Sequence, residues 1–236
     1  MEAQKFAIYN SSSEKMHELN GKSIDLAVMD PPFNIGLAYE GQVDETSHLN
    51  YLSSMNKVIK ETQRVLKPIG LALILLPVKI KKQGRVHEYP EEYDRLCDNA
   101  GLILVDSFSF KVYEEDFSCV PLNELENATT PENSHTQEMV GMVFGQMHQK
   151  LTKFPTGRKY YYTQKEGHPC PFPSELVKDI LDTYFVPGNR VLEQFSGTAG
   201  LGKEVLHRGG EYRGYESNPI YFEIAKEKLE RAGRTK

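Results

Sequence analysis

The chain has 236 residues, of which 39% are hydrophobic, and its formal net charge is −5. This length allows one sizeable α/β core, so a single domain over residues 1–236 is expected. The acidic balance excludes a protein coated in basic surface, such as a histone-like binder. The longest apolar run, residues 70–78, is far shorter than the roughly 20 residues of a membrane span. Because no apolar leader is seen either, a cytoplasmic protein without membrane contact is expected.

In its first half the chain alternates short apolar runs with helical periodicity. Residues 24–29 are nearly all apolar, as in a strand buried on both faces, and Pro31 and Pro32 end that strand. Ser11 opens a serine run that resembles a helix cap. In chain order the predicted elements are strand 6–9, helix 11–19, strand 24–29, mobile loop 34–47, helix 48–66, strand 71–76, helix 89–100 and strand 102–110.

The second half begins with a polar insertion and ends in a regular alternation of strands and helices. In chain order the predicted elements are insertion 114–134, strand 138–144, basic segment 146–166, helix 174–184, strand 190–193, helix 203–208, strand 212–215 and helix 219–232. Strands that alternate with helices are typical of an α/β doubly wound sheet. That fold class is therefore predicted.

The three cysteines, Cys97, Cys119 and Cys170, follow neither a CxxC nor a Cys/His ligand spacing. An odd number of thiols without such spacing favours reduced side chains over a disulfide framework or a zinc site. No metal is therefore expected.

A glycine-rich turn, residues 195–202, connects a strand to a helix, and Glu216 ends the next strand. Glycines let the backbone approach a ligand closely, and an acid at the neighbouring strand end accepts hydrogen bonds from ribose hydroxyls. The glycines do not spell G-x-G-x-x-G, so a nucleoside ligand without phosphates is favoured over a dinucleotide. A nicotinamide-dependent dehydrogenase is disfavoured for the same reason.

The tetrapeptide Asp30-Pro31-Pro32-Phe33 follows a buried strand, so it is expected at the carboxyl edge of the sheet, where such folds bind ligands. An exocyclic base nitrogen is a poor nucleophile because its lone pair is delocalised into the ring. If the Asp30 carboxylate and the Pro31 carbonyl each accept one N–H, that lone pair becomes available. The prolines fix the backbone, and Phe33 offers a face on which a flipped base stacks.

Two stretches, residues 79–87 and 148–168, concentrate positive charge in this acidic chain. The second interleaves tyrosines with basic residues, a composition that suits phosphates and stacked bases. Nucleic acid is therefore expected to contact Lys150, Lys153, Arg158, Lys159 and Tyr160. The alternative for the second stretch is a tyrosine-rich strand whose rings alternate into the core. In that case residues 79–85 are the next candidates for contact with nucleic acid.

Four segments in a fixed order carry a family resemblance. Residues 30–33 match D-P-P-[YF], and residues 168–173 resemble H-P-x-P-F-P. Residues 191–202 are similar to the loop V-L-D-P-F-x-G-S-G-T-T, and residues 215–219 resemble the strand end that follows it. Together they resemble the amino-methylating DNA methyltransferases, in the circularly permuted class whose catalytic motif precedes the cofactor motif.

The resemblance implies a Rossmann-like sheet of about seven strands, in which 6–9 lies beside the Glu216 strand and 24–29 beside the cofactor strand. It implies S-adenosylmethionine as cofactor and DNA as substrate. The implied catalytic residues are Asp30, Pro31, Pro32 and Phe33. The implied cofactor-binding residues are Ser11, His168, Phe172, Pro173, Glu193, Phe195, Ser196, Gly197, Thr198, Ala199, Glu216 and Ser217. Residues 112–136 and 146–167 are the implied target-recognition regions, and both are small.

This chain departs from the family pattern on its cofactor side. Glu193-Gln194-Phe195 stands for D-P-F, residues 197–201 stand for G-S-G-T-T, and Ser11 replaces an acid. N6-adenine methylation of DNA is the leading hypothesis, because Asp in the first motif position is the commoner choice for adenine in this family. The alternatives are N4-cytosine methylation, an RNA amino-methyltransferase and a weakened nucleic-acid-binding partner subunit. A homodimer and a separate specificity partner both stay open.

Overall fold

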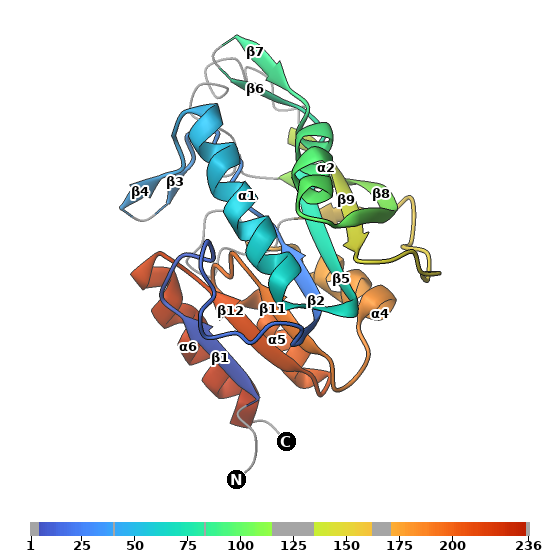
Figure 1. Cartoon of the computed structure of the whole chain (residues 1–236). Coiled ribbons are helices and arrows are strands. Elements are labelled where there is room, and N and C mark those ends of the chain that lie inside the picture. The colour runs from blue at the N-terminus through green and yellow to red at the C-terminus, as the bar shows by residue number, and fades with distance from the viewer. Residues whose placement is uncertain (1–4, 40, 83, 115–134, 162–170, 235–236) are drawn as a thin grey trace.

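The computed structural model describes residues 5–39, 41–82, 84–114, 135–161 and 171–234 (Figure 1). Eight strands in these ranges form one sheet, in the order β1-β12-β11-β2-β5-β9-β8-β10. In that order the strands are β1 (Phe6–Tyr9), β12 (Glu211–Tyr215), β11 (Arg190–Glu193), β2 (Ile24–Met29), β5 (Leu66–Pro77), β9 (His135–Gly145), β8 (Ile103–Glu114) and β10 (Lys159–Tyr161). The predicted α/β sheet is confirmed, with β10 as an additional edge strand.

Neighbouring strands from β1 to β5 run parallel. Strand β9 is antiparallel to both β5 and β8, and β10 is parallel to β8. The carboxyl ends of β2, β11 and β12 therefore meet at one edge of the sheet. The predicted neighbours are confirmed, because β1 pairs with β12 and β2 pairs with β11.

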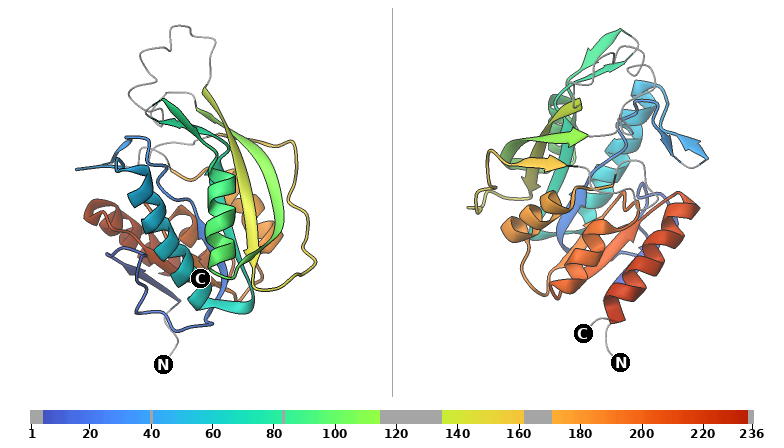
Figure 2. Two further views of the ribbon diagram at one scale, coloured as in Figure 1. Left: turned by 45° about the horizontal axis from the view of Figure 1, so that its top comes forward. Right: turned by 180° about the vertical axis from the view of Figure 1, so that it is seen from behind.

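Helices cover both faces of this sheet, as Figures 1 and 2 show from opposite sides. The helices are α1 (His48–Val65), α2 (Tyr89–Asn99), α4 (Ser174–Tyr184), α5 (Gly200–His207) and α6 (Pro219–Arg234). Strand β2 sends Leu26 and Val28 into the core beneath α4, α5 and α6. It sends Ala27 and Met29 into the core beneath α1 and α2. Both faces of β2 are apolar for this reason.

Helix α1 begins where the sequence predicts it. The Ser47 hydroxyl accepts a hydrogen bond from the Asn50 amide at 3.3 Å and caps the helix. The helix ends because Leu66 adopts an extended conformation and begins β5 directly. It therefore delivers the chain from the edge where β2 ends back to the opposite edge, as a crossover between parallel strands requires.

Two predictions for the first fifty residues are wrong. Residues 11–19 form turns and bends in place of a helix. Arg64 donates to the Leu19 and Met16 carbonyls at 2.9 and 2.8 Å, while Glu61 accepts the Met16 amide at 2.8 Å. Helix α1 thus takes the backbone groups that a helix would use. Within the predicted loop 34–47, β3 (Ala38–Tyr39) and β4 (Gln42–Val43) form a short hairpin.

A second hairpin, β6 (Ile80–Lys82) and β7 (Arg85–His87), follows the carboxyl end of β5. It occupies the first of the two basic stretches. The predicted insertion 114–134 falls almost entirely outside the described residues, as do Cys119 and Cys170. Cys97 is a buried free thiol. Within the described ranges, the helices are all too short or too polar to cross a bilayer.

Candidate active site

An open cavity of about 280 Å³ lies at the carboxyl edge of β2, β11 and β12. One side is Asp30–Phe33, called here the Asp30 wall. A second side, called the Glu216 wall, comprises Phe195, Gly197 and Glu216–Asn218. The volume approaches the roughly 300 Å³ at which ligand pockets begin. Two motifs that are far apart in the chain therefore meet at one cavity.

Asp30 directly follows β2, and the next two prolines fix the backbone at that point. In the part of the chain that the structure describes, its carboxylate makes no hydrogen bond. Burial raises the pKa of Asp30 to about 7, because desolvation disfavours the charged carboxylate. The carboxylate oxygens are thus available to donors that enter the cavity.

The loop after Phe33 is held at both ends. Asn34 adopts a left-handed conformation, with φ of 57°, and its Oδ1 accepts the Thr46 amide at 2.8 Å. The Lys82 ammonium donates to the carbonyls of Asn34 at 2.8 Å and Thr46 at 3.0 Å. The Tyr89 hydroxyl donates to the Phe33 carbonyl at 2.6 Å. Phe33 itself lines the cavity and packs against both halves of the core, which fixes its ring.

Glu216 closes the glycine-rich turn from the neighbouring strand. Its Oε2 accepts the Gly197 amide at 2.8 Å and its Oε1 accepts the Asn218 amide at 2.7 Å. Burial raises the pKa of Glu216, and these backbone donors oppose the shift. Each oxygen keeps further acceptor capacity toward the cavity. Gly197, with φ of 49°, lets the turn approach the carboxylate.

A third acid lies beneath the floor of the site. Glu193 is buried at the end of β11, where it accepts the Tyr212 hydroxyl at 2.6 Å. Burial, which outweighs the opposing hydrogen bond from Tyr212, and the nearby charges of Asp30 and Glu216 together raise the pKa of Glu193 to about 8. Among the described residues, the cavity lining includes acids but neither lysine nor arginine. Such a site favours a cationic ligand over a polyphosphate.

The structure separates the predicted cofactor residues into two groups. Phe195, Gly197, Glu216 and Ser217 line the cavity. Those that do not line it are Ser11, Phe172, Pro173, Glu193, Ser196, Thr198 and Ala199. Of these, Ser196 places its hydroxyl 3.0 Å from the Tyr212 hydroxyl, and Ala199, with φ of 54°, is the residue before α5. His168 lies outside the described residues.

Several cavity residues were not predicted. Tyr39, Val43 and Asp44 come from the β3–β4 hairpin and the chain that follows it, and Gln137 comes from β9. Tyr221, in the first turns of α6, also lines the cavity, and its ring meets that of Tyr39 edge-on at 6.4 Å between centroids. Two-residue strands show no sequence period, so no signal placed Tyr39 or Val43 at the site. Asn218 could have been predicted as a site residue, because it follows Glu216 in the motif of residues 215–219.

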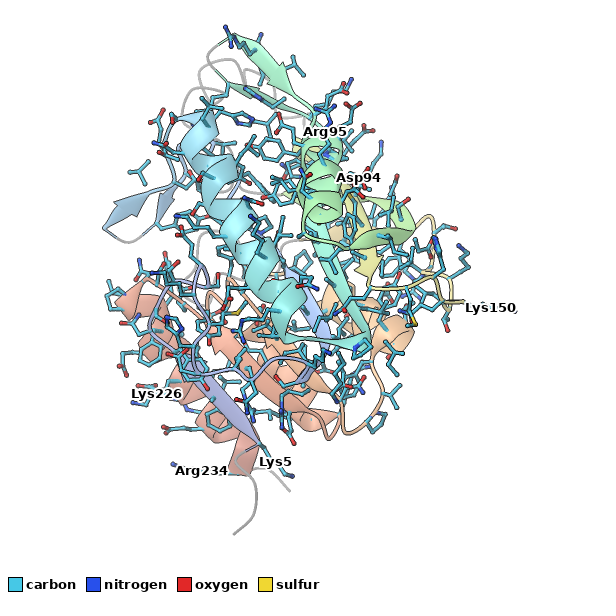
Figure 3. All side chains as sticks on the ribbon, viewed as in Figure 1. Lys5, Asp94, Arg95, Lys150, Lys226 and Arg234 are labelled. Atoms are coloured by element: carbon cyan, nitrogen blue, oxygen red, sulfur yellow. The ribbon has the colours of Figure 1, made fainter. Side chains whose placement is uncertain are left out.

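Within residues 148–161, the described part of the predicted nucleic-acid segment, the basic side chains do not form one surface near the cavity. Tyr160 is 1% exposed and donates to Asp179 at 2.8 Å, so its expected contact with nucleic acid is corrected to a core role. Arg158 pairs with the same carboxylate at 2.9 Å. Lys153 pairs with Asp106, which lies near the amino end of β8 and so at the edge of the sheet opposite the cavity. Figure 3 shows Lys150 on that side of the molecule as well. The alternative of a strand with an inward tyrosine fits β10, although Tyr161 is 46% exposed.

Comparisons with known proteins agree with this geometry. The DNA methylase family model N6_N4_Mtase matches residues 24–125 and 122–227. The chain is 23% identical over 252 residues to DNA adenine methyltransferase YhdJ of Escherichia coli strain K12, with 96% of this chain and 83% of that protein covered. The structure of the cytosine-N4-specific PvuII DNA methyltransferase matches with a TM-score of 0.75 at 16% identity, covering 96% and 86% of the two chains. A complex of M1.HpyAVI with S-adenosylmethionine matches with a TM-score of 0.63 at 16% identity, covering 95% and 98%.

The family match spans most of the chain, so this protein belongs to the N6/N4 DNA methylase family. The family resemblance found in the four motifs is confirmed. The chain is thus a DNA amino-methyltransferase of the N6-adenine or N4-cytosine type, and S-adenosylmethionine is its methyl donor.

Proposed function

We propose that this protein methylates the exocyclic N6 of adenine in DNA, with Asp30 as the residue that activates the amino group. One observation carries the proposal: a carboxylate without a hydrogen-bond partner in the described chain lines the same cavity as the Glu216 wall. An unpaired acid in a desolvating environment is costly, so such a group is typical of a functional site.

The cavity fits the cofactor. Glu216 offers carboxylate oxygens to ribose hydroxyls, while Phe195 and Gly197 present a ring and a close backbone. The acidic, lysine-free and arginine-free lining among the described residues suits a sulfonium cation without phosphates. When bound, S-adenosylmethionine supplies an electrophilic methyl group. The departures at Glu193 and Thr198 lie behind the cavity lining, so they do not obstruct it.

On the Asp30 wall, the carboxylate and the Pro31 carbonyl each accept one N–H of the target amino group. The nitrogen lone pair is then withdrawn from the ring and becomes nucleophilic. The carboxylate subsequently accepts the proton that the substituted nitrogen releases. A pKa of about 7 suits both steps, because a substantial fraction of the group is ionised in neutral solution yet the carboxylate is basic enough to hold a proton.

The base must leave the duplex to reach Asp30, because its amino group is paired there. Phe33 supplies an aromatic side chain next to Asp30, held in place by the core and by the Tyr89 bond to its carbonyl. A fixed ring costs little entropy when a base stacks on it. Adenine is favoured over cytosine by Asp30 in the first motif position and by the similarity to an enzyme named for adenine.

For the DNA surface we propose the β6–β7 hairpin, in place of most of the segment 148–168. The hairpin follows β5 at the cavity edge of the sheet and exposes Lys81 and Arg85. Lys79 is also largely exposed, although it approaches Glu88 at 3.3 Å. A two-stranded β-ribbon with basic side chains can follow a DNA groove. Lys159, exposed on β10 and directed over the Tyr113 ring at 5.4 Å, remains part of the proposed surface.

The proposal is tested by incubating the purified protein with isotopically labelled S-adenosylmethionine and with duplex DNA or RNA. Mass spectrometry of the digested nucleosides then identifies the product. We expect labelled N6-methyladenine from DNA. Labelled N4-methylcytosine would move the protein to the other branch of its family, and label in RNA alone would contradict the choice of polymer. No label in either polymer, with cofactor still bound, would favour a non-catalytic partner subunit.

A further inference from the structure

Two histidines and a glutamate from three separate elements meet behind the loop that carries Phe33. His48 is the first residue of α1, His87 the last of β7, and Glu92 lies in the first turn of α2. The Glu92 Oε1 atom is 3.0 Å from His48 Nε2 and 3.5 Å from His87 Nδ1. The two imidazole rings lie 3.8 Å apart between centroids.

We propose that His48, His87 and Glu92 bind a zinc ion. Imidazole nitrogens and a carboxylate are ligands that zinc accepts, at about 2.0–2.2 Å from the metal in a tetrahedral arrangement. Two such ligands are then roughly 3.3 Å apart. The observed separations of 3.0 and 3.5 Å bracket this value, and all three ligand atoms lie within 4.8 Å of one another.

An unsatisfied carboxylate oxygen in the cluster supports a bound cation. Glu92 Oε2 is buried and has no hydrogen-bond partner in the described part of the chain. A buried carboxylate oxygen without a partner costs free energy that a coordinated cation would remove. The side chains of His48, His87 and Glu92 are still 20%, 16% and 22% exposed. Solvent therefore reaches the cluster, so an ion can enter and a water can complete its coordination.

The ion would join the basic hairpin to the helices behind the active site. His87 belongs to the β6–β7 hairpin, whose Lys82 already bonds to the Asn34 and Thr46 carbonyls. Tyr89, two residues further on, bonds to the Phe33 carbonyl. Zinc at this point would hold the hairpin and the Phe33 loop in one arrangement, which makes its role structural. Cysteine spacing gives no sign of the cluster in the sequence, because its members lie in three separate elements without a ligand motif.

The test measures zinc binding and needs no enzymatic activity. The full chain, freed of metal by chelation, is dialysed against Zn²⁺, and its metal content and melting temperature are determined. His87→Ala and Glu92→Gln remove one ligand each, and His17→Ala, an exposed histidine of the N-terminal loop, serves as the control. Circular dichroism confirms that every variant is folded.

We expect one zinc per chain in the wild type and in His17→Ala, together with a higher melting temperature. Loss of a group that hydrogen-bonds to a metal ligand typically weakens metal affinity about 10–100-fold, so removing a ligand itself should cost at least that much. The proposal is overturned if the folded wild type binds no zinc, or if either ligand variant binds it as tightly as the control. Because methyl transfer is not measured, this outcome is independent of the proposed function.

Discussion

The two walls of the cavity each carry an acid, but the acids are held in opposite ways. Glu216 accepts two backbone amides, which fix its orientation before any ligand arrives. Asp30 has no such partner among the described residues, and proline rings alone fix the backbone beneath it. The difference indicates that the two walls have different roles in binding. The Glu216 wall is preorganised for a cofactor that binds in one pose, whereas the Asp30 wall keeps its acceptors for a substrate amino group.

The largest effect is expected from Asp30→Ala. Methyl transfer to DNA should fall roughly 10²–10⁴-fold, the range typical of a positioned catalytic polar group. The fold should be preserved because the carboxylate makes no hydrogen bond in the described chain. Asp94→Ala is the matched control, since Asp94 is exposed on α2 (Figure 3). An Asp30→Ala enzyme with wild-type turnover would remove Asp30 from the mechanism.

The complementary change is Glu216→Ala. Hydrogen bonds to a charged group typically contribute about 1.5–3 kcal/mol, so the cofactor Kd should rise about 10–150-fold. Calorimetric titration measures this directly, and DNA affinity should stay nearly constant. Glu223→Ala, an exposed acid on α6, is the control. Equal cofactor affinity in Glu216→Ala and in the control would exclude Glu216 from the cofactor site.

Phe33→Ala tests whether the Asp30 wall also carries the stacking platform. Aromatic stacking contributes roughly 1–3 kcal/mol per base, so affinity or turnover with duplex DNA should fall by about 5–150-fold. Phe33→Tyr should retain activity because it keeps the ring. If Phe33→Ala matches the wild type on duplex DNA, the ring is a packing residue and the flipped base stacks elsewhere.

The pH dependence follows from burial of Asp30. Because its pKa is raised to about 7 and the ionised form is the active one, kcat/KM should rise about tenfold per pH unit below that value and level off above it. Glu193→Gln removes the other acid with a strongly raised pKa. This variant should still show the rise of kcat/KM below about pH 7. A flat profile between about pH 6 and pH 7 would contradict the role of Asp30.

The same shift affects stability. A carboxyl whose pKa is higher in the folded state than in the unfolded chain stabilises the fold below its unfolded pKa, and this contribution is lost as pH rises through about 7. Asp30→Asn should therefore gain stability relative to the wild type as pH rises from about 4 to about 7, and the gap should level off above that. Thermal melts measure the difference, and a constant gap across this range would show that Asp30 is not desolvated.

The smallest effect is expected on the DNA surface. Replacing Lys79, Lys81 and Arg85 by alanine should weaken DNA binding and reduce the salt slope by up to about 0.9 per lost phosphate contact. The pair Lys150→Ala and Lys153→Ala, at the other edge of the sheet, should leave the slope unchanged. The reverse pattern would restore the segment 148–168 as the polymer-binding surface.

Much of this site could be predicted because its residues end buried strands. An apolar run located β2, the regular alternation of strands and helices located β12, and parallel strands bring Asp30 and Glu216 to the same edge. Other features had no local signal. A three-residue strand does not reveal which tyrosine faces inward, so Tyr160 was misassigned. The serine cap near Ser12 exists, with its hydroxyl accepting the Glu14 amide at 3.2 Å, but Arg64 and Glu61 from a distant helix prevent the helix.

The difference in role between the two walls is tested most directly by titrating S-adenosylmethionine into an Asp30→Ala protein that has lost turnover. We expect a cofactor Kd within about twofold of the wild type, because the lost interaction is made only with the reacting amino group. A Kd that rises as far as it does in Glu216→Ala would contradict the account, because Asp30 would then belong to the cofactor site and the two walls would act as one.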